Sequence, residues 1–580
     1  MKTVIVALNS KYIHSALAPW YLKANCTPDC GEVKVMEFSI NDMADSILSQ
    51  IYEENCDIVA FSCYIWNIGE VLKIADNLKK VLPKVRIVLG GPEVSFSSQE
   101  IMKNNSCIDF ILSGEGEEAF KNLLRSFSDP SVALSSIKSL TYRDGENIVC
   151  GGEYALIEDL NTIVSPYSEE MLDSVGNKML YYESSRGCPF NCSYCLSSTF
   201  KGVRYFNLER VKSDILMFIK RGTKIVKFVD RTFNCNPDRA KQIFTFIIEN
   251  AGDTCFHFEA AADLFDEEML SILSKAPEGL IQFEIGVQTT NAKTLEAINR
   301  KTNLKKVFEN VQKLNKMRNI HLHLDLIVGL PYEDYESFKK SFNDVCGLSP
   351  HQLQVGFLKL LKGSSIRRES DKHGYKFRDY PPYEVLSSDC LSYGEITRLK
   401  DMEDMVERFY NSGRFEKTLQ YLIKAFSSPF DFYEKLSEYF KACGYFKRSL
   451  SGRDLYTVIM NFVTDRKLDV DLKVVNELLK FDFLASNNTN NLPAGLVRNM
   501  EPGFKEKCFD FLKKEENISE YIPDFEGLTA KQIYTKVHFE KFQYDVTKDS
   551  IIQGSTVVLF DYTHYNSVSG RYNYIKVPVG

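Results

Sequence analysis

One loop decides how this chain is organised: Arg186-Gly187-Cys188-Pro189-Phe190-Asn191-Cys192-Ser193-Tyr194-Cys195. Its three cysteines have the spacing C-x3-C-x2-C and follow an apolar run, residues 179–183, that predicts a strand. Thiolates so close together in one loop can converge on a single soft-metal centre. A structural zinc ion normally takes four protein ligands, so a zinc site would need Cys235, Cys255 or a histidine as the fourth. Three cysteines suit a [4Fe-4S] cluster with one open iron, and the spacing favours iron–sulfur over zinc.

The aromatic residue before the last cysteine, Tyr194, makes the loop resemble the signature of radical S-adenosylmethionine (SAM) enzymes. The resemblance implies a [4Fe-4S] cluster held by Cys188, Cys192 and Cys195, whose open iron chelates the amino and carboxylate groups of SAM. It also implies reductive cleavage of SAM to a 5′-deoxyadenosyl radical. The backbone around Tyr194 is then expected to hold the adenine ring.

Length and composition limit the classes of protein that fit. A chain of 580 residues is too long for one core and predicts three or four domains. The net charge of −7 argues against a general nucleic-acid binder. No apolar run approaches the roughly 20 residues of a membrane-spanning helix, and the first residues do not read as a signal peptide. Fifteen cysteines therefore predict reduced thiols and metal ligands in a reducing cytoplasm.

Residues 1–128 alternate short apolar runs with helical segments. This pattern predicts an α/β fold with a doubly wound, Rossmann-like parallel sheet, whose ligand lies beyond the carboxyl ends of the strands. Glycines follow two predicted strands, in Gly90-Gly91-Pro92-Glu93 and in Gly114-Glu115-Gly116-Glu117. Tight βα turns alone would explain either glycine pair.

Together these features resemble the cobalamin-binding domain of one large branch of radical SAM enzymes. The resemblance implies cobalamin contacts from the ends of the strands, at Ser62, Tyr64, Gly90, Gly91, Glu93, Gly114 and Gly116. The Asp-x-His-x-x-Gly motif that supplies a cobalt-ligating histidine in many cobalamin proteins is absent. His14, in the first predicted βα loop, is a candidate lower ligand, although a lone loop histidine is more often simply a polar loop residue.

Methylthiotransferases also join a sheet domain to a radical SAM domain, but their sheet domain supplies three more cluster cysteines. Here only Cys63 occupies such a place, so we expect no second cluster. Residues 129–178 predict a β-hairpin with an Asp144-Gly145 turn and then an extended linker.

Residues 179–400 contain six strand candidates separated by helical patterns. They predict a partial (β/α)6 TIM-like barrel, open at one side, with chemistry at the carboxyl ends of its strands. Polar residues end or interrupt these apolar runs: Asp230, Glu259, Glu284, Gln288 and Asp325. Each charge needs a partner or a ligand if it is buried, and an ordinary buried salt bridge is the alternative explanation for each.

Three later segments resemble the fourth-, fifth- and sixth-strand motifs of the cobalamin-linked branch: residues 283–289 followed by Asn299-Arg300, residues 325–331, and residues 359–364. The resemblance implies that Glu284 contacts the ribose or amino group of SAM and that Gly329 and Pro331 pack near adenine. Asp230, Glu259 and Gln288 are expected to face SAM or substrate.

Residues 401–580 have apolar residues at helical spacing, with two strand-like runs at 556–562 and 572–577. They predict a mostly helical domain with a small β element, and they resemble an uncharacterised C-terminal extension of some cobalamin radical SAM proteins. We expect this domain to cover the barrel opening and the active site. It lacks an evident small basic β-barrel of the kind that delivers transfer RNA to methylthiotransferases.

The sequence thus predicts a cytoplasmic, oxygen-sensitive enzyme that binds a [4Fe-4S] cluster, SAM and cobalamin. Methyl transfer through methylcobalamin to an unactivated carbon is the reaction most expected from the resemblance. Ring closure, ring contraction or another carbon-skeleton reaction is the first alternative; an RNA-modifying enzyme and a non-catalytic zinc and corrinoid binding protein are the others. The expected partners are a small-molecule or peptide substrate and an external electron donor such as flavodoxin or ferredoxin.

Overall fold

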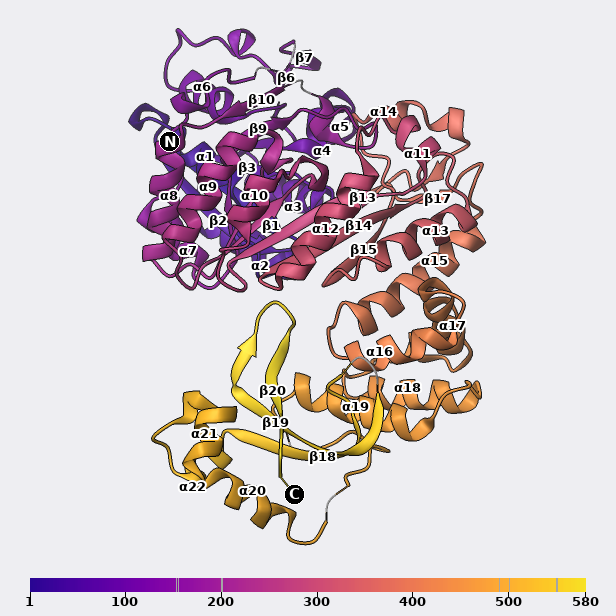
Figure 1. Ribbon diagram of the computed structural model, residues 1–580. Helices are drawn as coiled ribbons and strands as arrows, with labels where there is room; N and C mark the ends of the chain where they lie inside the picture. Colours follow the sequence, from indigo (N-terminus) through magenta and orange to yellow (C-terminus); the bar gives the residue numbers. More distant parts are fainter. Residues whose placement is uncertain are drawn as a thin grey trace.

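Figure 1 shows a computed structural model of the chain. It describes residues 1–152, 154, 156–199, 202–489, 491–499, 501–548 and 551–579. Two α/β parts contact each other in the upper half of Figure 1, and the C-terminal part from α16 (Glu416–Leu422) onward, coloured orange to yellow, lies below them.

The first part is a seven-stranded sheet with the order β2-β1-β3-β4-β5-β6-β7. Its first five strands pair in parallel: β1 (Lys2–Asn9), β2 (Glu32–Ser39), β3 (Ile58–Ser62), β4 (Arg86–Gly90) and β5 (Phe110–Leu112). Separate apolar clusters cover the two faces, one against α2 (Ala44–Glu53), α3 (Ile68–Val81) and α5 (Ser98–Asn104), the other against α1 (Ala18–Asn25) and α6 (Glu117–Ser126). The order 2-1-3-4-5 confirms the predicted doubly wound sheet.

The predicted hairpin is present as β6 (Leu140–Asp144) and β7 (Asn147–Cys150), with Gly145 at φ +60° in the turn. It does not stand apart as a connector, because β6 pairs antiparallel with β5. The hairpin covers an edge whose backbone groups would otherwise lack partners. The first sheet therefore extends to residue 150.

The second part is a six-stranded parallel sheet with the order β15-β14-β13-β12-β11-β8. Its strands are β8 (Leu180–Tyr182), β11 (Ile225–Phe228), β12 (Cys255–Glu259), β13 (Ile281–Gln288), β14 (Ile320–Val328) and β15 (Gln352–Phe357). The edge strands β8 and β15 do not pair with each other, which confirms the partial (β/α)6 barrel.

Helices cover the apolar face of this sheet: α8 (Leu208–Lys220), α9 (Pro237–Glu249), α10 (Glu267–Leu273), α11 (Ala292–Ala297), α12 (Leu304–Met317) and α13 (Tyr335–Cys346). Phe244 of α9 packs on Phe258 and Phe283, with ring centroids 5.3 and 5.7 Å apart. Residues alternate along β13 between buried and half-buried. The opposite, inner face of the barrel therefore carries the polar side chains of the strands.

The C-terminal part is mostly helical with a small sheet, as predicted. Its helices are α15 (Tyr393–Met405), α16 (Glu416–Leu422), α17 (Pro429–Ala442), α18 (Asp454–Asp465), α19 (Leu472–Ser486), α20 (Phe504–Leu512), α21 (Glu515–Tyr521) and α22 (Ala530–Tyr534). The sheet has three antiparallel strands, β18 (Val537–Asp545), β19 (Ile552–Asn566) and β20 (Arg571–Val577). The sequence analysis missed β18, in which a register shift between Phe542 and Tyr544 interrupts the strand alternation.

The place of this C-terminal part corrects one prediction. Asn411 Oδ1 accepts from Leu353 N at the start of β15 (2.9 Å), and Tyr410 Oη donates to Pro350 O. Ser567 lies against Gly279, just before β13. These contacts lie at the amino ends of the barrel strands, so the described part of residues 401–580 lies on that side and does not cover the carboxyl ends.

A shorter segment, which includes α14 (Ser365–Arg368) and Tyr375, lies at the carboxyl ends of the barrel strands instead. Ile366 N, in α14, donates to Ser193 O of the cysteine loop at 3.0 Å. Tyr375 Oη donates to Gly329 O, after β14, at 2.8 Å. Chain connectivity explains the arrangement, because α15 follows this segment and leads to the contacts at the amino ends. Within the described residues, no helix is long and apolar enough to cross a membrane.

Candidate functional site

The three cysteines lie at the carboxyl end of the barrel, as free thiols. Cys188 is the last residue of β9 (Ser185–Cys188), which pairs with β10 (Gly202–Tyr205) in a short hairpin. Gly187 has φ +100°, and a Cβ there would come within 2.2 Å of Gly202 O, so only glycine fits.

Neighbouring segments fix the loop from two sides. Ser193 N donates to Ile298 O (2.9 Å), and Ser193 O accepts from Ile366 N (3.0 Å). Cys195 N donates to Cys192 O at 3.1 Å, which closes a turn between these cysteines. In the part of the chain that the structure describes, no group of three His, Cys, Asp or Glu residues is close enough to hold a single metal ion.

Arg300 is the charged residue beside this loop. Its Nη1 donates to Tyr194 Oη (3.3 Å) and lies 3.8 Å from Cys192 Sγ, and its Nη2 donates to Gly286 O of β13. Burial raises the pKa of Cys192, whereas Arg300 and Tyr194 lower it. A guanidinium beside a thiol favours the thiolate that metal binding requires, so the donor set fits an anionic cluster.

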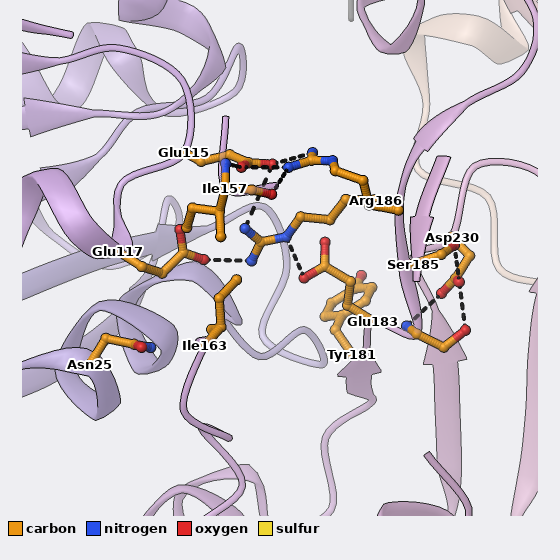
Figure 2. Close-up of polar contacts among 12 residues, drawn as sticks. Asn25, Glu115, Glu117, Ile157, Ile163, Tyr181, Glu183, Ser185, Arg186 and Asp230 are labelled. Carbon is orange, nitrogen blue, oxygen red and sulfur yellow. Dashed lines mark hydrogen bonds and ion pairs between the residues drawn. The ribbon is translucent and has the colours of Figure 1, made fainter. Parts of the chain in front are cut away.

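Asp230 follows β11 and is 1% exposed. Its carboxylate accepts from Ser184 N (2.9 Å), Ser184 Oγ (2.7 Å) and Ser185 Oγ (2.5 Å), as Figure 2 partly shows. Both carboxylate oxygens are therefore engaged in holding the turn between β8 and β9. The SAM contact expected of Asp230 stays a prediction.

The Gly114–Glu117 turn of the first sheet points its two carboxylates at the radical SAM half (Figure 2). Glu117 Oε1 accepts from Arg186 Nη2 at 2.5 Å, and Arg186 Nε donates to Glu183 at 2.9 Å. Glu115 accepts two hydrogen bonds from Arg204, at 2.5 and 2.9 Å. Burial raises the pKa of Glu183 to about 7, against the effect of Arg186.

The inner face of the barrel gathers the predicted carboxylates with basic side chains that the sequence analysis missed. Glu284 Oε2 accepts from Lys227 Nζ (2.8 Å) and lies 3.2 Å from His257 Nε2. Burial alone would raise the pKa of Glu284, but His257 and Lys227 hold it well below its usual range. Lys227 and His257 alternate with apolar residues along β11 and β12, and this period-2 pattern was the sequence signal that could have placed them on the inner face.

Two more inner carboxylates differ in their partners. Asp325 Oδ1 lies 3.1 Å from His323 Nε2. Glu259 has no hydrogen bond or ion pair with any residue that the structure describes, and burial raises its pKa to about 7. Glu259 is thus the carboxyl group on this face that is free to receive a ligand.

Gln288 and Gly329 both adopt positive φ, +71° and +91°. The Gln288 side chain fills the space in which a Cβ on Gly286 would lie, and its Oε1 is buried with no partner among the described residues. Pro331 follows the Gly329 turn, whose carbonyl is already bonded to Tyr375. These positions are compatible with the predicted SAM contacts and do not test them.

The predicted cobalamin contacts lie at the carboxyl ends of β3, β4 and β5, where Ser62, Gly90 and Gly114 end or follow a strand. Gly91 has φ +108°, and a Cβ there would come within 2.6 Å of Cys63 O. Glu93 is 6% exposed and accepts from Tyr383 Oη, and burial raises its pKa. Close backbone packing therefore requires Gly91, in agreement with the alternative explanation that these glycines form a tight βα turn.

Tyr64 stacks on Trp66, with centroids 4.4 Å apart and ring planes at 4°. Trp66, which the sequence analysis missed, is 43% exposed beyond β3. His14 Nδ1 lies 2.8 Å from Tyr181 Oη, and Met179 N donates to Ile13 O at 2.8 Å. The loop after β1 is thereby tied to edge strand β8, and His14 as a lower cobalt ligand stays a prediction.

Three family models match the chain in sequence order. Residues 3–124 match the B12 binding domain, residues 182–345 the radical SAM superfamily, and residues 371–560 a protein family of unknown function, DUF4080. The first match contains the five parallel strands β1 to β5, and the second contains β11 to β14 of the barrel.

Individual proteins share the same combination. The cobalamin-dependent radical SAM methyltransferase TokK of Streptomyces tokunonensis is 26% identical over 59% of this chain and 52% of its own length. An anaerobic magnesium-protoporphyrin IX monomethyl ester cyclase of Rubrivivax gelatinosus is 24% identical over 80% of this chain and 85% of its own length. The chain spans about half the length of several curated relatives.

Among solved structures, the cobalamin-dependent SAM radical enzyme OxsB with aqua-cobalamin bound superposes with a TM-score of 0.59 at 13% identity. The superposition covers 84% of this chain and 81% of the OxsB chain, which shows a shared fold. The chain thus combines regions that match the B12 binding domain and the radical SAM superfamily with a DUF4080 region in the place of the predicted C-terminal extension.

Proposed function

We propose that this chain is a cobalamin-dependent radical SAM enzyme that transfers a methyl group to an unactivated carbon. The observation that carries the proposal is the junction of the two halves: the cysteine loop lies between β9 and β10, the two hairpin strands that Glu117 and Glu115 of the B12-binding domain hold. When bound, the cluster supplies the electron that cleaves SAM, and cobalamin supplies a methyl group to a carbon radical.

The chain's own residues bind and orient these groups. Cys188, Cys192 and Cys195 are the cluster ligands, and Arg300 supports Cys192. Glu259, the inner carboxyl that lacks a hydrogen bond or ion pair within the described part of the chain, is suited to an ammonium group such as that of SAM. Lys227 and His257 keep Glu284 ionised and oriented on the inner face of β13.

The remaining cofactor contacts follow the sequence predictions. Tyr194, Asp230, Gln288, Gly329 and Pro331 lie toward SAM. The cobalamin contacts lie beyond the first sheet, at Ser62, Tyr64, Gly90, Gly91, Glu93, Gly114 and Gly116, with His14 as the candidate lower ligand. The proposal includes a small-molecule or peptide substrate and an external donor such as flavodoxin or ferredoxin. A reducing cytoplasm suits the free cysteines.

Methyl transfer is preferred because TokK and a hopanoid C-3 methylase are methyltransferases by name. A cyclisation is the second candidate because the Rubrivivax cyclase covers 80% of this chain. The inner face of the barrel does not separate these reactions.

One anaerobic assay tests the proposal. The protein is reconstituted with iron, sulfide and hydroxocobalamin, and SAM and a strong reductant are added. 5′-Deoxyadenosine and S-adenosylhomocysteine are then quantified beside a Cys192→Ala control. Both products, lost together in the control, support methyl transfer; 5′-deoxyadenosine alone favours the cyclisation class. If neither product forms and no cobalamin stays bound, the proposal is wrong.

A further inference from the structure

Five charged residues form one largely buried group between the B12-binding domain and the radical SAM domain, and Figure 2 labels four of them, Glu115, Glu117, Glu183 and Arg186. We call this group the clamp; its members are Glu115, Glu117, Glu183, Arg186 and Arg204. Their side chains are between 8 and 23% exposed. The proposed chemistry uses none of them.

The clamp holds both strands of the hairpin that flanks the cysteine loop in the sequence, β9 before it and β10 after it. Arg186 lies on β9, two residues before Cys188, and Arg204 is its register partner on β10. Glu117 accepts from Arg186, and Glu115 accepts two hydrogen bonds from Arg204. Two carboxylates of a single turn of the B12-binding domain thus hold the hairpin from both strands.

The linker between the domains is held by the same residues. Ile157 N donates to Glu115 Oε2 at 2.7 Å, and Ile157 O accepts from Arg204 Nη1. On the other side of the hairpin, Asp230 holds Ser184 and Ser185. The base of the hairpin is therefore restrained by the barrel and by the first domain at once.

We propose that the clamp sets the distance and orientation between the cobalamin site and the cluster site, and that its five members are positioning residues. Paired guanidinium–carboxylate bonds restrict orientation, which non-directional apolar packing does not. Transfer between two bound groups depends on their separation. A restraint on Arg186, two residues before the cluster ligand Cys188, therefore limits how far the cluster can move relative to cobalamin. The proposal rests on the proposed function, since it assigns one cofactor to each side.

The test compares Glu117→Gln with Glu118→Gln. Glu118 is the matched control, because it is adjacent but 67% exposed, and its ion pair among the described residues is with Lys121 of its own helix. In apo protein, amide hydrogen exchange is measured over residues 185–188 and 202–205. We expect Glu117→Gln to speed exchange there by roughly tenfold or more, as the loss of a charge-assisted hydrogen bond implies, and Glu118→Gln to change nothing.

In loaded protein, the magnetic interaction between cob(II)alamin and the reduced cluster is measured by electron paramagnetic resonance. We expect Glu117→Gln to alter this interaction at full iron and cobalamin content. Arg204→Lys, which keeps the charge but loses the paired geometry, provides a milder variant should Glu117→Gln not fold, and we expect it to change both readouts in the same direction.

The proposal would be overturned if Glu117→Gln and Arg204→Lys, with both cofactors bound, changed neither the exchange rate nor the magnetic interaction. Wild-type protein that binds neither cofactor contradicts the proposed function instead. The exchange measurement on apo protein still decides whether these residues restrain the hairpin.

Discussion

The barrel contacts its two neighbours through chemically different junctions. Toward the B12-binding domain it presents buried guanidinium groups to carboxylates, in the clamp around Arg186. Toward the C-terminal part it presents aromatic rings: Phe430 of α17 is fully buried against Tyr335 and Phe342 of α13, with centroids 5.7 and 5.6 Å apart. There the pair Lys339–Asp431 is partly exposed, at 27 and 19%.

The two junctions show that the strength of a domain contact and its fixed orientation can come from different interactions. Apolar burial stabilises a junction strongly without a preferred direction, whereas paired charges constrain both distance and angle. The directional contacts occur beside the cysteine loop and the carboxyl ends of the first sheet. Apolar contacts occur at both junctions, because Tyr21 of α1 stacks on Phe206 with centroids 6.5 Å apart, but at the α13–α17 junction the rings are the fully buried contacts.

Breaking the charged junction has the largest expected effect. Arg186→Met leaves Glu117 and Glu183 buried without their partner, and we expect the free energy of unfolding to fall by about 5 kcal/mol. Urea denaturation of the apo protein measures it. Arg221→Met is the control, because Arg221 pairs with exposed carboxylates, and it should change little. A loss in Arg186→Met no larger than in the control would contradict the buried pairing.

Breaking the apolar junction should cost slightly less. Phe430→Ala removes a fully buried ring and leaves a cavity, so we expect a loss of about 4 kcal/mol in the same assay. Phe430→Leu keeps most of the volume and should cost less than about 1.5 kcal/mol. Equal losses in the two variants would show that ring packing does not hold this junction.

The pH dependence of stability tests the charged junction separately, because its member Glu183 has a raised pKa. The folded-state pKa of about 7 lies above the ordinary value of 4.5, so folding favours the protonated carboxyl. This contribution is complete below pH 4.5 and is lost as pH rises through about 7. We expect wild type to lose on the order of 3 kcal/mol more than Glu183→Gln between about pH 5 and about pH 8. Parallel pH profiles of the two proteins would refute the assignment.

The smallest effect is expected from the partly exposed ion pair of the apolar junction. Lys339→Met removes the partner of Asp431, and we expect a loss of less than about 1 kcal/mol. The loss should shrink further at high salt, because solvent screens the pair. A loss comparable with that of Arg186→Met would remove the contrast between the two junctions.

Local patterns in the sequence predicted most of the fold. The C-x3-C-x2-C loop, the alternation of apolar runs with helical segments and the Asp144-Gly145 turn each depend on residues close in the chain. The doubly wound sheet, the partial barrel and the helical C-terminal part followed from them and are confirmed. Strand β18 was missed because a register shift breaks its alternation.

The sequence by itself thus determined the order of the parts and the set of residues able to bind the cofactors. Only the tertiary structure decided which of these residues are already paired: Glu284 with Lys227, Glu117 with Arg186, and Glu259 with no described residue. It also decided that the C-terminal part contacts the barrel at the amino ends of its strands, as Asn411 does at β15. The physical reason is that periodicity records which face of a strand or helix is buried, whereas partners 57 or 69 residues apart are brought together only by the packing of whole elements.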